Sequence, residues 1–233
     1  MQKGVEKVNK FYNFVNKSDV CEVYLYGDVG AWDEVNVADF KAQLEGVDSE
    51  KPLNIHISSY GGEVNEGLTI ASIIKQHKGK TKAIIDSWAC SIASIIACSC
   101  DELEMYPSSM LMIHNALCCA YGNAKELREQ ADVLDKISNS LKTVYLEKSN
   151  GKLDIDKITE LMDAESWLSA QECLEYGLCD KIINPQKAVA KLDVGILDKY
   201  NNVPEQIKNQ IKQQNIENEI NDKLIDLCLE LNL

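Results

Sequence analysis

Residues 52–85 read PLNIHISSYGGEVNEGLTIASIIKQHKGKTKAII and contain a strand, a helix and a second strand in direct succession. Apolar side chains alternate with polar ones over residues 52–58, which predicts a strand. Apolar residues then recur at helical spacing over 63–77, which predicts a helix, and residues 81–85 form the next strand. Short strand–helix–strand connections are typical of an α/β fold with a largely parallel sheet.

The segments around this unit continue the same pattern. A strand is expected over residues 20–26, and Asn36 is a suitable N-cap for a short helix that ends around Gly46. Residues 89–100 are almost all small or apolar. A helix formed here has no polar face, so it must be buried at the centre of the domain.

The rest of the chain divides into a helix-rich part and a polar tail. The expected elements are strands at 102–106, 110–114 and 178–183, and helices at 124–149, 156–162 and 169–177, the last opened by a capping box of Ser169 and Glu172. Residues 185–233 are polar with apolar residues at helical spacing. We therefore expect one domain over 1–184 and an amphipathic helical tail over 185–233, which folds back on the domain or binds a partner.

Composition argues against several classes of partner. The 233 residues include 37 acidic and 24 basic side chains, a net charge of −13, and no block of Lys or Arg could follow a phosphate backbone. We therefore expect no nucleic acid and no anionic membrane as partner. No apolar run reaches the roughly 18 residues of a membrane span, and the first residues lack the apolar stretch of a signal peptide. These features predict a soluble, cytoplasmic protein.

The chain contains nine cysteines, which in such a protein favour a reducing compartment. Thiols there pack as small apolar groups or bind metal. A zinc site would have to combine Cys98 and Cys100 with Cys118 and Cys119, whose spacings are not those of structural zinc sites. We therefore expect buried thiols and no metal.

Two turns at strand ends carry candidate catalytic groups. Gly61 and Gly62 follow a strand and open a helix, where backbone N–H groups can approach a ligand closely, although an ordinary tight turn is the alternative. Ser91 lies where a strand turns into the apolar helix, whose free N–H groups stabilise negative charge. Ser87 and Ser94 are competing nucleophiles, and an N-cap serine without a catalytic role has the same sequence pattern.

Three histidines are candidates for a catalytic base. His56 lies in the middle of a strand, on the face opposite its apolar neighbours. His77 lies at a helix end, where a favourable interaction with the helix dipole is a sufficient explanation. His114 closes an apolar strand, and α/β sheets present functional side chains at such strand ends; a structural histidine is the alternative there.

Five motifs follow one another along the chain: Tyr60-Gly61-Gly62, Ala89-Cys90-Ser91-Ile92-Ala93-Ser94, Met112-Ile113-His114-Asn115, Trp167-Leu168-Ser169-Ala170 and Glu175-Tyr176-Gly177-Leu178-Cys179-Asp180. In order and spacing they resemble the Clp protease proteolytic subunit family of serine peptidases. Residues 24–27, Trp32 and the doubled serine of Ser91 and Ser94 are closer to the Clp-like head maturation proteases of phages and prophages. The resemblance covers about residues 20–183 and implies a crotonase-like ββα spiral.

The resemblance assigns Ser91 as nucleophile, His114 as general base, and the backbone N–H groups of Gly62 and Ile92 as the oxyanion hole. The chemistry agrees, because a serine hydroxyl needs an imidazole to take its proton and a tetrahedral oxyanion needs preorganised donors. The histidine follows the serine and precedes the acid, an order that differs from those of chymotrypsin, subtilisin and the α/β-hydrolases.

The resemblance also implies the acid and the substrate site. The family's aspartate corresponds to Glu165 here, and Asp163 is the second candidate. Residues 61–62 and Asn115 would bind a peptide that adds as a strand. Tyr60 stands where the family commonly has proline, a departure that alters the cleft without removing a catalytic group.

The function implied is that of an ATP-independent serine endopeptidase, encoded by a prophage and processing capsid-assembly proteins. Its substrate is a polypeptide, it needs no cofactor, and copies of the chain join into rings through the apolar stripe of the helix at 124–149. One alternative is a housekeeping Clp subunit that works with an ATPase unfoldase. Alternatives from other classes are a crotonase-type acyl-CoA hydratase or isomerase, which would carry a carboxylate in the pocket, and an inactive ring scaffold.

Overall fold

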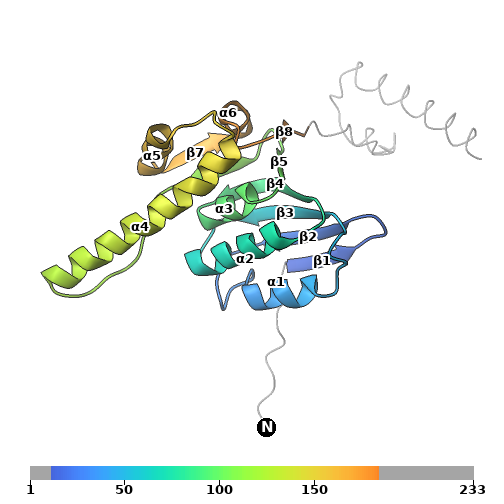
Figure 1. The fold of residues 1–233 in the computed structure, drawn as a ribbon, viewed down its shortest axis with the longest axis horizontal. Coiled ribbons are helices and arrows are strands. Elements are labelled where there is room, and N and C mark those ends of the chain that lie inside the picture. Colours follow the sequence, from blue (N-terminus) through green and yellow to red (C-terminus); the bar gives the residue numbers. More distant parts are fainter. Residues whose placement is uncertain (1–11, 184–233) are drawn as a thin grey trace, which may run out of the picture. The chain divides into compact units, whose positions relative to one another are not determined.

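A computed structural model describes residues 12–183, which form one mixed sheet with helices packed against it (Figure 1). The expected boundary at residue 184 and the helical tail at 185–233 lie outside the described residues. The elements are β1 (Tyr12–Asn16), β2 (Cys21–Tyr26), α1 (Val37–Leu44), β3 (Leu53–Ser59), α2 (Val64–Gln76), β4 (Thr81–Cys90), α3 (Ile92–Cys98), β5 (Glu102–Met105), β6 (Met110–Ile113), α4 (Ala124–Ser149), α5 (Ile155–Asp163), β7 (Ser166–Ser169), α6 (Ala170–Tyr176) and β8 (Lys181–Ile182).

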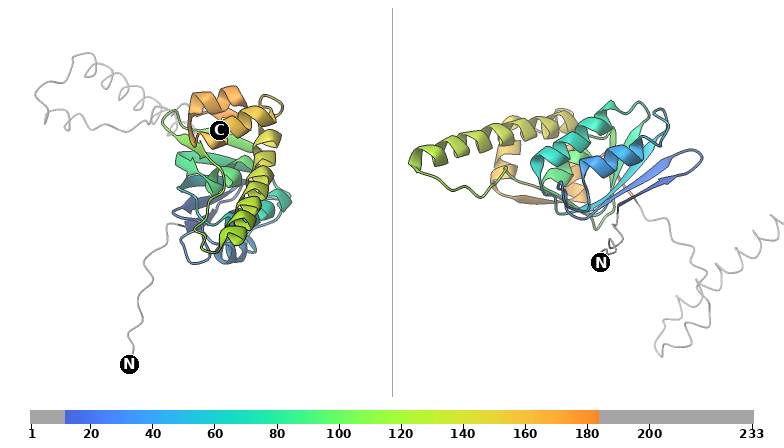
Figure 2. Two further views of the ribbon diagram at one scale, coloured as in Figure 1. Left: turned by 90° about the vertical axis from the view of Figure 1, so that its left-hand side faces the viewer. Right: turned by 90° about the horizontal axis from the view of Figure 1, so that it is seen from below.

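The sheet confirms the expected α/β class. Its strand order is β1-β2-β3-β4-β5-β8, and β6 lies beside β4 and β7. Every pairing is parallel except those of β1 with β2 and of β6 with β7. Helices α1, α2 and α3 lie together on one face of this sheet (Figures 1 and 2).

The strand β4 is longer than predicted from the sequence, so Ser91 directly follows a strand and does not lie within the helix. We expected the strand to end at residue 85 and the apolar helix to begin at Ala89, but β4 continues to Cys90 and α3 begins at Ile92. The first part of β4 pairs with β5, and residues 88–90 pair with β6. Small buried residues suit a central strand as well as a central helix, so the composition concealed this boundary.

The helix α3 is buried on all sides, as predicted for a segment without a polar face. All seven of its residues are buried. It packs so closely against α2 that a side chain in place of Gly67 would collide with Ile92. The start of α3 is therefore held by the core and not by solvent-exposed contacts.

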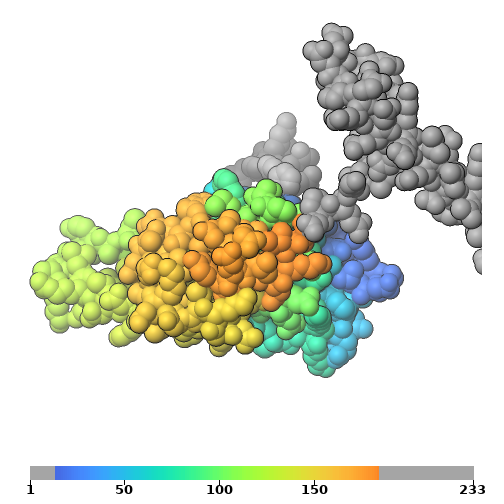
Figure 3. Space-filling view, turned by 90° about the horizontal axis from the view of Figure 1, so that it is seen from above, coloured from blue at the N-terminus to red at the C-terminus, as the bar shows by residue number. Residues whose placement is uncertain are grey.

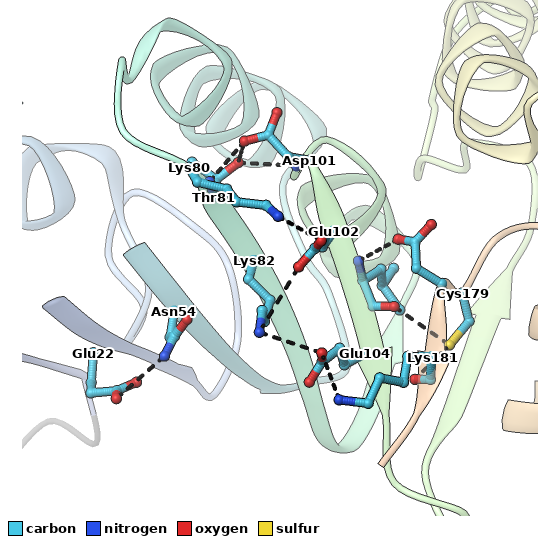
Figure 4. A network of polar contacts seen from close by, with 12 residues as sticks. Glu22, Asn54, Lys80, Thr81, Lys82, Asp101, Glu102, Glu104, Cys179 and Lys181 are labelled. Atoms are coloured by element: carbon cyan, nitrogen blue, oxygen red, sulfur yellow. Dashed lines mark hydrogen bonds and ion pairs between the residues drawn. The ribbon is translucent and has the colours of Figure 1, made fainter. Parts of the chain in front are cut away.

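The sheet face away from these helices carries charged side chains that pair with one another (Figure 4). Lys82 lies 3.3 Å from Glu104 and 3.9 Å from Glu102, and Lys181 also contacts Glu104 at 3.4 Å. Alternating burial along β3 and β5 separates this polar face from the core. No metal-binding group of three or more His, Cys, Asp or Glu side chains occurs among residues 12–183.

The long helix α4 has the predicted bounds, but only part of its apolar stripe is exposed. A capping box of Asn123 and Glu126 starts it. Its first turns stand out from the rest of the domain, and Leu127 there is 42% exposed (Figure 3). Leu141 and Tyr145, further along, are buried in the subunit's own core. We expected the whole stripe to contact a neighbouring copy, which is wrong for Leu141.

The end of the domain departs from the sequence prediction in small ways. The Ser169–Glu172 capping box and the stop of α6 at Gly177 are confirmed. The strand expected over residues 178–183 is limited to β8, and β1 and β7 were not predicted. Among residues 12–183, no helix has both the length and the apolar character of a membrane span.

Candidate active site

Ser91 stands at the junction of β4 and α3 in an uncommon backbone conformation. Its φ is 55° and its ψ is −126°, a region that few residues other than glycine adopt. Its amide donates to the Met112 carbonyl at 2.9 Å, which anchors the turn to β6. Strain of this kind persists where the surrounding structure enforces it and is concentrated at functional sites.

His114 follows directly after β6, the strand beside β4. Its Nε2 atom lies 2.7 Å from the Ser91 hydroxyl oxygen. Within residues 12–183 this hydroxyl is the one hydrogen-bond partner of the His114 ring. The structure therefore brings the predicted nucleophile and base together, in the geometry that a base needs to take a hydroxyl proton.

A cavity of about 240 Å³ opens beside this pair. Its lining consists of Tyr60, Gly62, Val64, Ser91, Ile92, His114, Asn115, Ala116, Leu117 and Leu141. None of these lining residues carries a carboxylate, whereas a crotonase-type hydratase or isomerase would have one in the pocket. Apolar side chains, among them Val64, Ile92 and Leu141, form much of its wall.

Two backbone amides at the cavity suit an oxyanion hole. Gly62 has φ 147° and follows Gly61, which has φ 97°, so the turn uses conformations open to glycine. A side chain on Gly61 would meet the Ser91 Cβ at 2.7 Å. Within the described part of the chain, the amides of Gly62 and Ile92 donate to no other group. Both N–H groups remain available to a ligand oxygen.

The two candidate acids lie close to this site, but neither contacts His114. Asp163 accepts a hydrogen bond from the Asn115 amide at 2.7 Å. Glu165 is exposed and makes no side-chain hydrogen bond or ion pair with residues 12–183. It has φ 48°, in the left-handed region. The antiparallel pairing of β6 and β7 ends at Ile113 opposite Ser166, so His114 directly follows and Glu165 directly precedes this last pair.

The competing serines have other partners. Ser94 is fully buried and donates to the Ser91 carbonyl at 2.6 Å, and its hydroxyl also lies 2.7 Å from that of Tyr145. Ser87 pairs with Ser58 at 2.7 Å. Neither serine has a histidine as a hydrogen-bond partner, so the geometry favours Ser91.

The other two histidines have structural contacts. Nε2 of His77 lies 2.7 Å from the Lys51 carbonyl oxygen. His56 lies between Asp86 at 2.9 Å and Glu22 at 3.3 Å. Burial lowers the pKa of His56, but the hydrogen bonds and charges of Asp86 and Glu22 together outweigh burial and raise it.

The four cysteines considered above for a zinc site lie in two different environments. Cys98 and Cys100 are buried, and burial raises the pKa of both thiols to about 12. Cys118 and Cys119 are exposed in the segment before α4, so the expectation of buried thiols is wrong for these two.

The helix α4 is tied to the active site by contacts that the sequence did not reveal. The amide of Ala116 donates to the Ser138 hydroxyl at 3.0 Å, and Leu141 lines the cavity. Position along the helix identified Leu141 as part of an apolar stripe, but no local signal indicates which side of the stripe faces the site.

Residues 6–186 match the family described as Clp protease. The chain belongs to the Clp protease family. The ATP-dependent Clp protease proteolytic subunit 1 of Protochlamydia amoebophila is 34% identical over 145 residues, which cover 60% of this chain and 69% of that protein. The corresponding subunits of Bacteroides thetaiotaomicron and Bacteroides fragilis are each 30% identical over 142 residues, which cover 60% of this chain and 64% and 68% of theirs.

Membership of the Clp protease family agrees with the fold described above. It also makes the chain a Clp-type proteolytic subunit, which is the coarser part of the function expected from the sequence. The matched region includes Ser91, His114 and both candidate acids.

Proposed function

We propose that this Clp-type subunit is a serine endopeptidase in which Ser91 attacks the peptide carbonyl. The observation that carries the proposal is the 2.7 Å contact between the Ser91 hydroxyl and Nε2 of His114 at the mouth of the cavity. His114 takes the hydroxyl proton during attack and later donates it to the leaving amine. The acyl-enzyme formed at Ser91 is then hydrolysed by water.

The amides of Gly62 and Ile92 receive the oxyanion in this mechanism. They border the cavity on the side of Ser91 and donate to no other described residue. Donors fixed before the reaction stabilise developing charge without reorganising, which is the source of their catalytic effect. The peptide backbone would bind as an added strand along residues 61–62 and Asn115.

Glu165 is our proposed acid. Its backbone lies next to the last β6–β7 pair, Ile113 and Ser166, which His114 directly follows, and this position supports the role. A rotation of its flexible side chain would carry the carboxylate toward Nδ1 of His114, where it would orient the ring and stabilise the imidazolium. Asp163 is the less favoured candidate because its carboxylate is already bonded to Asn115.

The subunit is proposed to work in a ring of identical copies joined through the exposed first turns of α4. Leu127 there is 42% exposed, whereas Leu141 and Tyr145 further along the helix are buried in the core. The Ala116–Ser138 hydrogen bond links the segment after His114 to the same helix. Assembly would therefore order the active site.

We further propose that the enzyme acts without ATP and processes capsid-assembly proteins of a prophage. The support is the resemblance of residues 24–27, Trp32 and the doubled serine to phage proteases. The test is cleavage of an unfolded protein such as casein by the purified chain without nucleotide, with Ser91→Ala as control. Cleavage that begins only when an ATPase unfoldase and ATP are added would instead identify a housekeeping subunit.

A further inference from the structure

Three exposed aromatic rings form a continuous row beside the active site. The ring centroids of Tyr60 and Trp88 are 5.2 Å apart with an interplanar angle of 76°, and those of Trp88 and Trp167 are 5.6 Å apart at 81°. Tyr60 is 64% exposed, Trp88 37% and Trp167 45%. We call Tyr60, Trp88 and Trp167 the aromatic ladder.

The aromatic ladder begins at the catalytic cavity. Tyr60 lines the cavity together with Ser91 and His114. Trp88 lies on β4 three residues before Ser91, and Trp167 lies on β7 opposite Met112 in the sheet register. The ladder therefore joins the segments that carry the oxyanion turn, the nucleophile and the proposed acid.

The three rings have no polar partner of their own. Within residues 12–183, the Tyr60 hydroxyl and the two indole N–H groups make no hydrogen bond, and none of the three rings contacts a cation. The edge-to-face packing fixes the rings relative to one another, and it leaves apolar surface open to solvent. Large exposed aromatic surface that continues from a catalytic cavity is typical of a binding site.

We propose that the aromatic ladder is a specificity subsite that binds an apolar, preferably aromatic, side chain of the peptide substrate. This inference rests on the peptidase function proposed above. Neighbouring ring centroids of the aromatic ladder are 5.2 and 5.6 Å apart. An extended peptide rises about 3.3 Å per residue, so the ladder spans at most about three residues of a bound peptide. The recognised side chain lies within about three residues of the scissile bond.

The first experiment measures the selectivity of the full-length enzyme. Internally quenched octapeptides of Ser, Ala and Gly carry one Phe at successive positions around the cleavage site, and the matched peptide carries Ser instead. We expect a KM about tenfold lower for the best Phe peptide than for its Ser counterpart. Trp167→Ser should remove most of this ratio, and Trp167→Phe should restore it.

The control variant is Trp32→Ser, because Trp32 is 96% exposed and is not part of the ladder. The selectivity ratio should be unchanged in this variant. An equal ratio in wild type and Trp167→Ser would overturn the proposal. So would a change of particle size in Trp167→Ser without a change in the ratio, since the ladder would then be a contact between copies.

A second experiment observes binding without turnover. The chain has three tryptophans, so Ser91→Ala combined with Trp32→Phe leaves Trp88 and Trp167 as the emitting groups. The Phe peptide should change their fluorescence in a saturable titration, and the Ser peptide at the same concentration should not. Equal responses would overturn the proposal. Absence of fluorophosphonate labelling at Ser91 in the wild type would instead refute the peptidase function itself.

Discussion

Nε2 of His114 lies 2.7 Å from Oγ of Ser91, although the two residues are 23 positions apart in the sequence. The contact results from the topology of the sheet. Residues 88–90 of β4 pair in parallel with residues 110–112 of β6, and each catalytic residue comes just after its strand. Ends of neighbouring parallel strands meet at one edge of the sheet, so the site is built by strand pairing and not by a local loop.

The acid can be identified by exchanging each carboxylate for its amide. Glu165→Gln should lower kcat by orders of magnitude, since an aspartate-to-asparagine change in a comparable triad costs about 10⁴. Asp163→Asn should have a mild effect, because its carboxylate bonds Asn115. Peptide cleavage by both variants gives the ranking, and the opposite ranking would transfer the role to Asp163.

A third substitution at the same position separates catalysis from stability. Glu165 has φ 48°, where glycine is unstrained. The free energy of unfolding of Glu165→Gly, measured in urea, should therefore equal that of the wild type or exceed it by up to about 1 kcal/mol. The variant should nevertheless lose activity. A variant that is both active and more stable would show that Glu165 has no role in the reaction.

Ser94 is expected to contribute to stability and not to chemistry. Ser94→Ala leaves the hydroxyl of Tyr145 without its partner in a site where the tyrosine is 1% exposed. We expect a loss of about 1–3 kcal/mol in urea unfolding, partly restored by adding Tyr145→Phe. Labelling of Ser91 should persist. If Ser94→Ala abolishes activity and Ser91→Ala retains it, the nucleophile lies one helical turn further along.

Assembly and activity should depend on the exposed turns of α4. Leu127→Glu with Leu134→Glu places carboxylates in the proposed contact between copies, at a cost of several kcal/mol. Sedimentation should show smaller particles and cleavage should fall with them, while circular dichroism stays that of the wild type. Lys136→Glu, on the side of the helix opposite Leu127 and Leu134, is the control. A fully active wild-type monomer would contradict the ring.

His56 should stabilise the fold mainly in its charged form. Its pKa is raised by Asp86 and Glu22 in spite of burial. The stabilisation is therefore fully present below the unfolded pKa of about 6.5 and is lost as the pH rises through the higher folded pKa.

The variant His56→Gln should be about 1–3 kcal/mol less stable than the wild type at pH 5.5. This difference should shrink toward high pH in urea unfolding curves. The labelling of Ser91 should be unaffected, and a lost label would make His56 part of the catalytic site. A difference that grows with pH would contradict the ion pairs.

Helices with local start and stop signals were predictable from the sequence, and pairings between distant residues were not. Asn123 and Asn150 bracket α4, and its bounds agree with the prediction. The strand β7 has only four residues and forms because β6 lies beside it. Similarly, the motif around Ser91 indicated the nucleophile. The positive φ of Ser91 arises because β4 runs to Cys90 and α3 begins at Ile92, a boundary that we predicted incorrectly from the sequence.

The most direct test of the account is to map where a fluorophosphonate probe attaches to the full-length protein. Mass spectrometry of the digested, labelled protein should place the probe on Ser91. Ser91→Ala should carry no label and cleave no peptide, and His114→Ala should label far more slowly because the hydroxyl has lost its base. A probe attached to another serine, or labelling that is unaffected by removal of His114, would contradict the catalytic pair.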